Sequence, residues 1–273
     1  MSNVLVVTSG KGGVGKTTSS ASLGASLARA GQKVVVVDFD VGLRNLDLVM
    51  GAERRVVFDL VNVVQGDAKL PQALIRDKRL ETLSLLPASQ TRDKDALTEA
   101  GVGKVIDELR ESFDWIICDS PAGIEKGATM AMRFADTAVV VTNPEVSSVR
   151  DSDRIIGMLD SKTRRAEAGD RIDKQLLLTR FDAGRASRGE MMTVDDVLEI
   201  LAIPLLGIVQ ESADVLTASN LGCPVTLHNP ASPAARAYDD AARRLMGEAI
   251  PVRTPRAEKP GLMARLFGKR AAA

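Results

Sequence analysis

Short, nearly continuous apolar runs alternate along the chain with longer stretches of helical periodicity. The apolar runs lie at residues 4–7, 34–37, 83–87, 115–118, 137–142, 175–179 and 205–209. Runs of this kind are typical of strands that are buried on both faces of a sheet. The alternation of strands and helices therefore predicts an α/β fold, with a single doubly wound, mostly parallel sheet and helices on both faces.

The periodic stretches predict the helices between these strands. Apolar residues recur at helical spacing in residues 19–29, 96–112, 146–159, 193–200 and 233–246. Residues 54–73 also favour helical turns, which Gly66 and Pro71 are expected to interrupt. We expect residues 1–250 to form one domain, followed by a proline-containing linker at 251–259 and a separate C-terminal segment at 260–273.

The composition is that of an ordinary soluble globular protein. Of 273 residues, 45% are hydrophobic and 26% are charged, and 36 basic residues balance 36 acidic ones. This balance gives no sign of a nucleic-acid partner. The chain begins directly with a strand and lacks the run of roughly 18 apolar residues that a membrane span needs. We therefore expect the protein to be in the cytoplasm.

The few cysteine and histidine residues exclude several kinds of site. Cys118 and Cys223 are far apart and lack metal-ligand spacing, and His228 is the only histidine. Zinc sites and histidine-based catalytic triads are therefore unsupported.

The segment SGKGGVGKTT at residues 9–18 has the spacing of a phosphate-binding loop, G-x-x-x-x-G-K-[ST]. A glycine-rich stretch alone could be a flexible turn, but this one follows a predicted strand and opens a helix. We expect Lys16 to reach the β- and γ-phosphates and the Thr17 hydroxyl to ligate Mg²⁺, with the helix dipole adding positive potential. The residues expected to bind the nucleotide are Gly10, Lys11, Gly12, Gly13, Val14, Gly15, Lys16, Thr17 and Thr18.

Three carboxylates follow predicted strands. Asp38 and Asp40 come after the second apolar run, and Asp119 ends the run at 115–118. In open parallel sheets, ligands bind at the carboxyl ends of the strands, which brings these acids to the phosphate loop. We expect Asp40 to orient the attacking water, Asp38 to support the magnesium shell or the loop, and Asp119 to hold Mg²⁺. Each could instead be an acid of an ordinary turn. Gly123 could offer a backbone N–H to the γ-phosphate.

Several motifs together resemble one family. The loop reads KGGVGKT, with a second lysine at Lys11, and it is accompanied by DFDVGLRNLDL, CDSPAG, TNPEVSSVRDSDR and a basic amphipathic C-terminus. In these features the chain resembles the ParA/MinD family of deviant Walker A ATPases, which are P-loop NTPases, and within it the members that position the division septum. The resemblance covers nearly the whole chain.

The resemblance implies a function that spacing alone does not show. It implies an ATP-dependent homodimer with bound Mg²⁺, in which Lys11 contacts the phosphates of the facing subunit, although Lys11 could be a solvated loop lysine. It also implies recruitment of a MinC-like division inhibitor and release by a MinE-like activator of ATP hydrolysis. The implied partner face comprises Arg44, Asn45, Leu48, Glu53, Asp151 and Asp153.

The base preference is less clear from the residues themselves. Thr179-Arg180-Phe181-Asp182 comes near the guanine signature [NT]-K-x-D but has arginine in place of lysine. The family precedent favours adenine, with Arg180 beside the base.

The C-terminal segment has the pattern of a membrane-surface helix. At about 100° per residue, Leu262, Met263, Leu266 and Phe267 fall within an arc of roughly 140°. Arg265 flanks this arc, while Lys269 and Arg270 could extend to anionic lipid phosphates from the frayed end of the helix. One tail should bind only marginally, whereas two tails on a dimer gain roughly 10²–10⁴ in avidity. We therefore expect peripheral attachment to the inner face of the cell membrane. A solubilising end, or a helix packed on the core, is the alternative.

Other classes of protein share parts of this pattern. A ParA-like DNA-partitioning ATPase would share the loop and dimer but needs a basic DNA-binding surface. An iron–sulfur protein of the nitrogenase iron-protein kind would carry a cysteine where this chain has Ala122. A small-molecule kinase would need an acceptor pocket, of which the sequence gives no sign.

Overall fold

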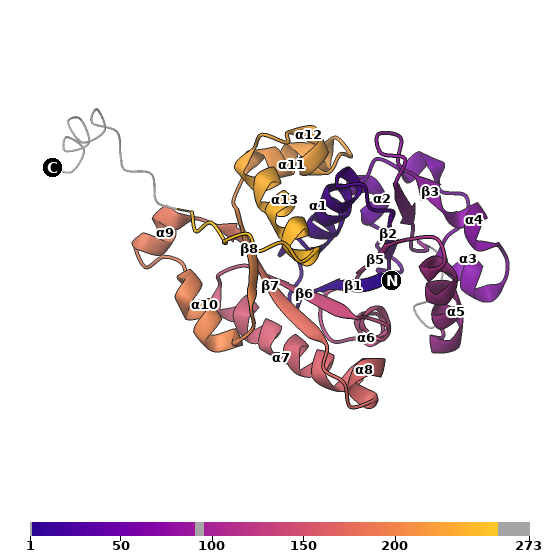
Figure 1. The fold of residues 1–273 in the computed structure, drawn as a ribbon, viewed down its shortest axis with the longest axis horizontal. Helices are drawn as coiled ribbons and strands as arrows, with labels where there is room; N and C mark the ends of the chain where they lie inside the picture. The colour runs from indigo at the N-terminus through magenta and orange to yellow at the C-terminus, as the bar shows by residue number, and fades with distance from the viewer. Residues whose placement is uncertain (1, 91–95, 256–273) are drawn as a thin grey trace.

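The computed structural model describes residues 2–90 and 96–255, which form one eight-stranded sheet in the order β3-β4-β2-β5-β1-β6-β7-β8 (Figure 1). Every neighbouring pair of strands is parallel except β3 and β4. The mostly parallel, doubly wound sheet expected from the sequence is therefore confirmed. The strands are β1 (Asn3–Thr8), β2 (Val34–Asp38), β3 (Ile75–Arg76), β4 (Leu83–Leu86), β5 (Trp115–Asp119), β6 (Thr137–Thr142), β7 (Asp173–Phe181) and β8 (Leu205–Gln210).

Helices cover both faces of this sheet (Figure 1). Side chains alternate along β1, so Val4 and Val6 enter one core while Leu5 and Val7 enter the other, and all four are fully buried. The first core also receives apolar residues of α5, α6, α7 and α10, and the second those of α1, α11, α12 and α13. Burial on both sides explains why the strands read as continuous apolar runs.

The helices are α1 (Lys16–Arg29), α2 (Leu46–Val49), α3 (Leu60–Gln65), α4 (Leu70–Ala73), α5 (Glu99–Arg110), α6 (Lys126–Met132), α7 (Val146–Lys162), α8 (Arg164–Glu167), α9 (Ala183–Ser187), α10 (Val194–Leu201), α11 (Ala213–Asn220), α12 (Val225–His228) and α13 (Pro233–Leu245), with a 3₁₀ turn at Glu53–Arg55. The predicted helix at 96–112 is shorter than expected, because the Thr98 side chain caps α5 by accepting from the Gly101 N–H. Pro71 lies in the first turn of α4 and so begins a helix instead of interrupting one.

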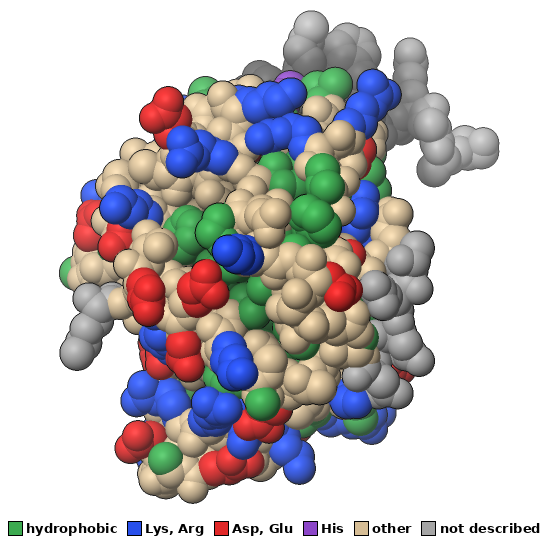
Figure 2. All heavy atoms as spheres, turned by 90° about the vertical axis from the view of Figure 1, so that its right-hand side faces the viewer, with side chains coloured by type: hydrophobic (Ala, Val, Ile, Leu, Met, Phe, Trp, Pro, Cys, Tyr) green, Lys and Arg blue, Asp and Glu red, His purple; other side chains and the backbone are tan. Residues whose placement is uncertain are grey.

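The surface over the β3 edge of the sheet is mixed in charge. Lys and Arg side chains gather toward one end of this face, while acidic and basic side chains alternate toward the other, with a hydrophobic patch between them (Figure 2). This pattern agrees with the balanced composition of the whole chain.

Residues 250–255 form a strap that is packed against the domain. The Arg244 guanidinium of α13 donates to the carbonyl oxygens of Ile250, at 2.7 Å, and Pro251, at 2.8 Å. It also donates to Leu206 O of β8 at 2.7 Å, and Val252 packs on the apolar core. The first part of the expected linker, 251–255, is therefore held against β8 and α13.

The rest of that linker, residues 256–259, lies outside the described residues. So do the residues predicted to contact the membrane, which are Leu262, Met263, Arg265, Leu266, Phe267, Lys269 and Arg270. In residues 2–90 and 96–255, no helix combines the length and the apolar character needed to cross a bilayer.

Replacing Arg244 with alanine should release the strap. The variant loses three hydrogen bonds from one cation, which we expect to cost about 1–3 kcal/mol of folding free energy, because the group is only partly buried. Amide hydrogen exchange should become faster at residues 250–255, while the sheet keeps its protection. Arg243→Ala is the matched control, because Arg243 pairs with the exposed Glu248 instead. Unchanged exchange in the strap of Arg244→Ala would contradict the assignment.

Candidate nucleotide-binding site

The loop between β1 and α1 requires glycine for two different reasons. Gly13 and Gly15 have φ values of 76° and 92°, a left-handed conformation that other residues rarely adopt, and Gly15 precedes the first turn of α1. Gly10 is needed for space, because a Cβ there would lie 2.2 Å from the carbonyl oxygen of Asp151 in α7. The loop therefore turns tightly under α7 and presents the N-terminus of a 14-residue helix to an anion.

Lys16 is buried at the start of α1, with only 8% of the residue exposed. Its ammonium donates to Ser9 Oγ at 3.0 Å, and Ser9 Oγ in turn donates to the Lys11 carbonyl oxygen at 2.7 Å. Burial lowers the pKa of Lys16, while the nearby carboxylates of Asp119 and Asp40 oppose that shift. A cation in this setting has a strong electrostatic reason to bind an additional anion such as phosphate.

Asp38 and Asp119 lie side by side at the carboxyl ends of β2 and β5, which are paired in register at these two residues. Each is only 1% exposed. Burial and the neighbouring carboxylate raise the pKa of Asp38 to about 8, and burial raises the pKa of Asp119 to about 6. Keeping two neighbouring carboxylates ionised in a buried place costs free energy, and a divalent cation beside them would lower that free energy.

The donors around Asp119 fit a magnesium ion bound together with phosphate. The Ser20 hydroxyl donates to Asp119 Oδ1 at 2.7 Å, and the side chains of Ser20 and Thr17 both oppose the rise in the pKa of this carboxyl. Mg²⁺ prefers oxygen ligands and is usually held by one or two protein groups together with substrate phosphates. The structure thus brings Thr17 and Asp119 together as the sequence predicted, although their role as ligands stays a prediction.

Asp38 holds the segment that follows β2. Its carboxylate accepts from the backbone N–H groups of Asp40, at 2.8 Å, and Leu46, at 3.3 Å. Residues 39–46 therefore wrap around one buried carboxylate and carry the half-buried Asp40 beside the phosphate loop. Asp40 therefore lies where its charge acts on Lys16. The support of the magnesium shell or the phosphate loop expected of Asp38 stays a prediction.

The expected partner residues divide by exposure. Asn45, Leu48, Glu53 and Asp153 are exposed, whereas Asp151 is half-buried beneath the loop. Arg44 is also largely covered, because its guanidinium lies 2.7 Å from the buried Asp47 carboxylate and its side chain is 15% exposed. Its backbone is left-handed as well, with φ of 47°. The role of these residues in partner binding stays a prediction.

Lys11 is held within its own chain. Its ammonium lies 3.2 Å from Glu145 Oε2 and 2.9 Å from Ser147 Oγ, at the start of α7. Local sequence patterns do not reveal these contacts, although Glu145 and Ser147 both belong to the TNPEVSS motif. The Gly123 N–H, expected to be free for a γ-phosphate, donates instead to the Ser9 carbonyl oxygen at 3.1 Å.

A pocket beside the loop could receive the base. It is lined by Val14, Gly15 and Thr18 of the loop and α1, by Thr179 and Arg180 of β7, and by Tyr238 of α13. The Thr179 hydroxyl contacts the Val14 carbonyl oxygen at 2.7 Å and so ties the loop to β7. No sequence pattern indicates that Tyr238 lines this pocket. Its hydroxyl forms a hydrogen bond of 3.0 Å with the Ser19 hydroxyl, and the two residues are 219 positions apart in the chain.

Comparisons with known proteins agree with this geometry. Residues 5–225 match the family model described as the CobQ/CobB/MinD/ParA nucleotide binding domain. The septum site-determining protein MinD of Escherichia coli K12 is 62% identical over 270 residues, which cover 98% of this chain and 100% of that protein.

Solved structures agree as well. The MinC:MinD cell division protein complex of Aquifex aeolicus is similar with a TM-score of 0.83 and 42% identity, over 93% of this chain and 99% of that chain. The septum site-determining protein MinD of Pyrococcus horikoshii, complexed with Mg-ADP, has a TM-score of 0.79 and 30% identity, over 92% of this chain and 100% of that chain. The chain therefore belongs to the CobQ/CobB/MinD/ParA nucleotide-binding family and, within it, to the septum site-determining MinD proteins.

Proposed function

We propose that this protein is an ATP hydrolase that dimerises when it binds ATP and Mg²⁺ and acts in placing the division septum. The observation that carries the proposal is the arrangement of the site. A phosphate loop with two lysines, Lys11 and Lys16, lies beside the buried carboxylates of Asp38 and Asp119. A relative of known structure is complexed with Mg-ADP, which supports the same ligands here.

The roles proposed for the side chains follow from their positions. The loop N–H groups and Lys16 bind the phosphates, and Arg180 lies against the base in the pocket next to β7. Thr17 and Asp119 hold Mg²⁺, which neutralises charge on the phosphates when it is bound. Asp40 orients the attacking water, because it lies at the edge of the loop on a segment that Asp38 fixes. Catalysis is then mainly positioning and charge stabilisation.

Lys11 gives the reason for dimerisation. We propose that it leaves Glu145 and Ser147 of its own chain and contacts the phosphates bound to the facing subunit. The exchange replaces one exposed ion pair, which is worth little, with a charge-assisted contact to a phosphate. ATP thus favours the dimer because its phosphates complete a site that one chain leaves unfinished.

The proposed partners follow from the relatives. The structure of a MinC:MinD complex supports a MinC-like division inhibitor as partner. We extend the proposal to a MinE-like activator of hydrolysis, which would release the protein from an anionic membrane surface. The residues proposed to insert are Leu262, Met263, Leu266 and Phe267, at the inner face of the cell membrane.

The alternative functions are less well supported. A DNA-partitioning role is not favoured, because the 62% identical relative is a septum site-determining protein. A shared iron–sulfur cluster is not proposed either, because Ala122 stands where proteins with such a cluster carry the bridging cysteine, and Cys118 is 1% exposed.

Replacing the two lysines one at a time should distinguish nucleotide binding from turnover. Lys16→Ala should lose nucleotide affinity and turnover together, since its ammonium contacts the bound phosphates directly. Lys11→Ala should still bind ATP but lose on the order of 10³-fold in turnover, by analogy with arginine fingers. Nucleotide titration and phosphate release per subunit measure the two effects. Equal turnover in wild type and Lys11→Ala would refute the contribution in trans.

Replacing Asp40 should slow hydrolysis without removing ATP. Asp40→Ala should reduce turnover by about 10²-fold, a common size for the loss of one catalytic group. The ATP-bound dimer should then persist longer, and the protein should stay on vesicles longer than wild type. Faster departure of Asp40→Ala from vesicles would show that this residue has another role.

Truncation tests the membrane anchor. Deleting residues 262–273 should abolish ATP-dependent sedimentation with anionic vesicles, because the apolar residues proposed to insert are removed. Nucleotide affinity should not change, since the site lies entirely within residues 2–90 and 96–255. If the truncated protein still sediments with vesicles in ATP, the anchor lies elsewhere.

A further inference from the structure

An arginine-rich surface surrounds α13 and the strap. It comprises Arg29 at the end of α1, Arg236 and Arg243 on α13, and Arg253 on the strap, and we name these four residues the α13 ledge. They line one solvent-facing hollow of about 370 Å³, together with Ser26, Ala30, Asp239 and Asp240. The active-site residues lie elsewhere, so the proposed catalysis does not account for this surface.

The charges of the ledge are only partly compensated. Arg29 pairs with Asp239 at 3.1 Å, Arg243 with Glu248 at 2.6 Å, and Arg253 with Asp240 at the longer distance of 3.6 Å. Arg236 is exposed, and within residues 2–90 and 96–255 it forms no ion pair. Four arginines thus meet three acids, and the side chain of Arg253 is 77% exposed.

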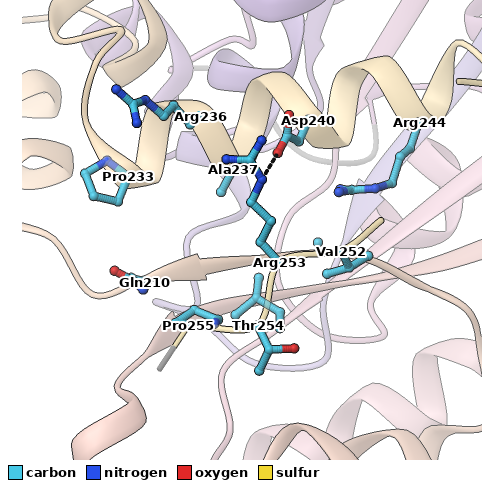
Figure 3. A pocket seen from close by; sticks show the side chains of 12 residues that line it. Gln210, Pro233, Arg236, Ala237, Asp240, Arg244, Val252, Arg253, Thr254 and Pro255 are labelled. Atoms are coloured by element: carbon cyan, nitrogen blue, oxygen red, sulfur yellow. Dashed lines mark ion pairs between the residues drawn. The ribbon is translucent and has the colours of Figure 1, made fainter. Parts of the chain in front are cut away.

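Figure 3 shows how the strap contributes to this surface. Arg253 points from the strap toward Asp240 on α13, while Arg236, near the N-terminal end of the same helix, points away from it. Pro255, the last described residue, lines the adjoining pocket with Arg236 and Arg253. The ledge therefore lies directly beside the point from which the C-terminal segment continues.

This position limits how far the ledge can be from a membrane. Six residues, 256–261, lie between Pro255 and Leu262, the first residue proposed to insert, and the seven steps from one Cα to the next span at most about 25 Å when the chain is fully extended. Arg244 holds the strap at the carbonyl oxygens of Ile250 and Pro251 while it also donates to Leu206 O of β8. The tether can therefore lengthen beyond this point only if these two hydrogen bonds to the strap break.

We infer that the α13 ledge is a second membrane contact, which binds the phosphates of anionic lipid headgroups while the C-terminal segment inserts. This inference rests on the proposed membrane attachment and adds a surface of the folded domain to it. Guanidinium groups suit the role, since they bind phosphate through two parallel hydrogen bonds and are weakly hydrated. The loosely paired Arg253 and the unpaired Arg236 make the principal contacts.

The ledge would act as an orienting contact rather than as an anchor. A flexible tether alone leaves the domain free to rotate, whereas a charged surface next to the tether brings one face toward the bilayer. Attraction to an anionic surface falls off within about 10 Å at ordinary ionic strength, so it acts only after the tail has brought the domain close. A dimer carries two ledges, and their contributions multiply.

The test uses the full-length protein with ATP and Mg²⁺, sedimented with vesicles that contain either 30–40% anionic lipid, on the order of a charged natural leaflet, or zwitterionic lipid alone. Arg236→Glu should weaken the apparent affinity for anionic vesicles roughly tenfold and leave binding to zwitterionic vesicles unchanged. Arg236→Lys should keep most of the affinity. Arg171→Glu is the matched control, since Arg171 is an exposed arginine just before β7 and lies outside the ledge. The ATPase activity in solution should not change in any of the three variants.

The outcomes separate this inference from the proposed function. If Arg236→Glu binds anionic vesicles like wild type while truncation at residue 262 abolishes binding, the ledge is not a membrane contact, and the proposed anchor is supported. If truncation has no effect, the proposed anchor itself is wrong. If Arg236→Glu instead reduces binding to duplex DNA and not to vesicles, the ledge is a nucleic-acid surface and the inference is overturned.

Discussion

The burial of Asp38 and Asp119 side by side, next to the buried ammonium of Lys16, is the constraint on which the site depends. Parallel pairing of β2 with β5 forces the two carboxylates together, and the loop after β1 brings the lysine beside them. Water is largely excluded, so these charges act on one another and on a ligand more strongly than they would at a surface. A magnesium-bound phosphate would supply a positive charge for the two carboxylates and a negative charge for the lysine.

The loop, the segment after β2 and α7 meet around this charge cluster. Asp38 holds residues 39–46, Gly10 lies against Asp151 of α7, and Lys11 reaches the start of the same helix. A phosphate bound by the loop would therefore lie close to the segment after β2 and to the start of α7. In this way one small ligand could govern dimerisation and partner binding. Because a dimer carries two C-terminal segments, the same ligand could also set the strength of membrane attachment.

The sequence predicted the sheet and the phosphate loop well because both have strong local signals. Strands buried on both faces leave uninterrupted apolar runs, and the loop needs glycines and a lysine at fixed spacing. Short helices such as α8 and α12 have too few residues to show periodicity, and the strap at 250–255 looked like a linker because its fixed position depends on Arg244. The contacts of Lys11 with Glu145 and of Ser19 with Tyr238 join distant parts of the chain, which local patterns cannot reveal.

The central claim is that a magnesium-bound triphosphate joins two copies of this chain. Light scattering of the purified, full-length protein measures this most directly, with the molar mass recorded in ATP and Mg²⁺ and again in ADP and Mg²⁺ without lipid. The account predicts twice the mass of one chain in ATP and the mass of one chain in ADP. A single chain in both nucleotides, or a dimer of equal stability in both, would contradict it.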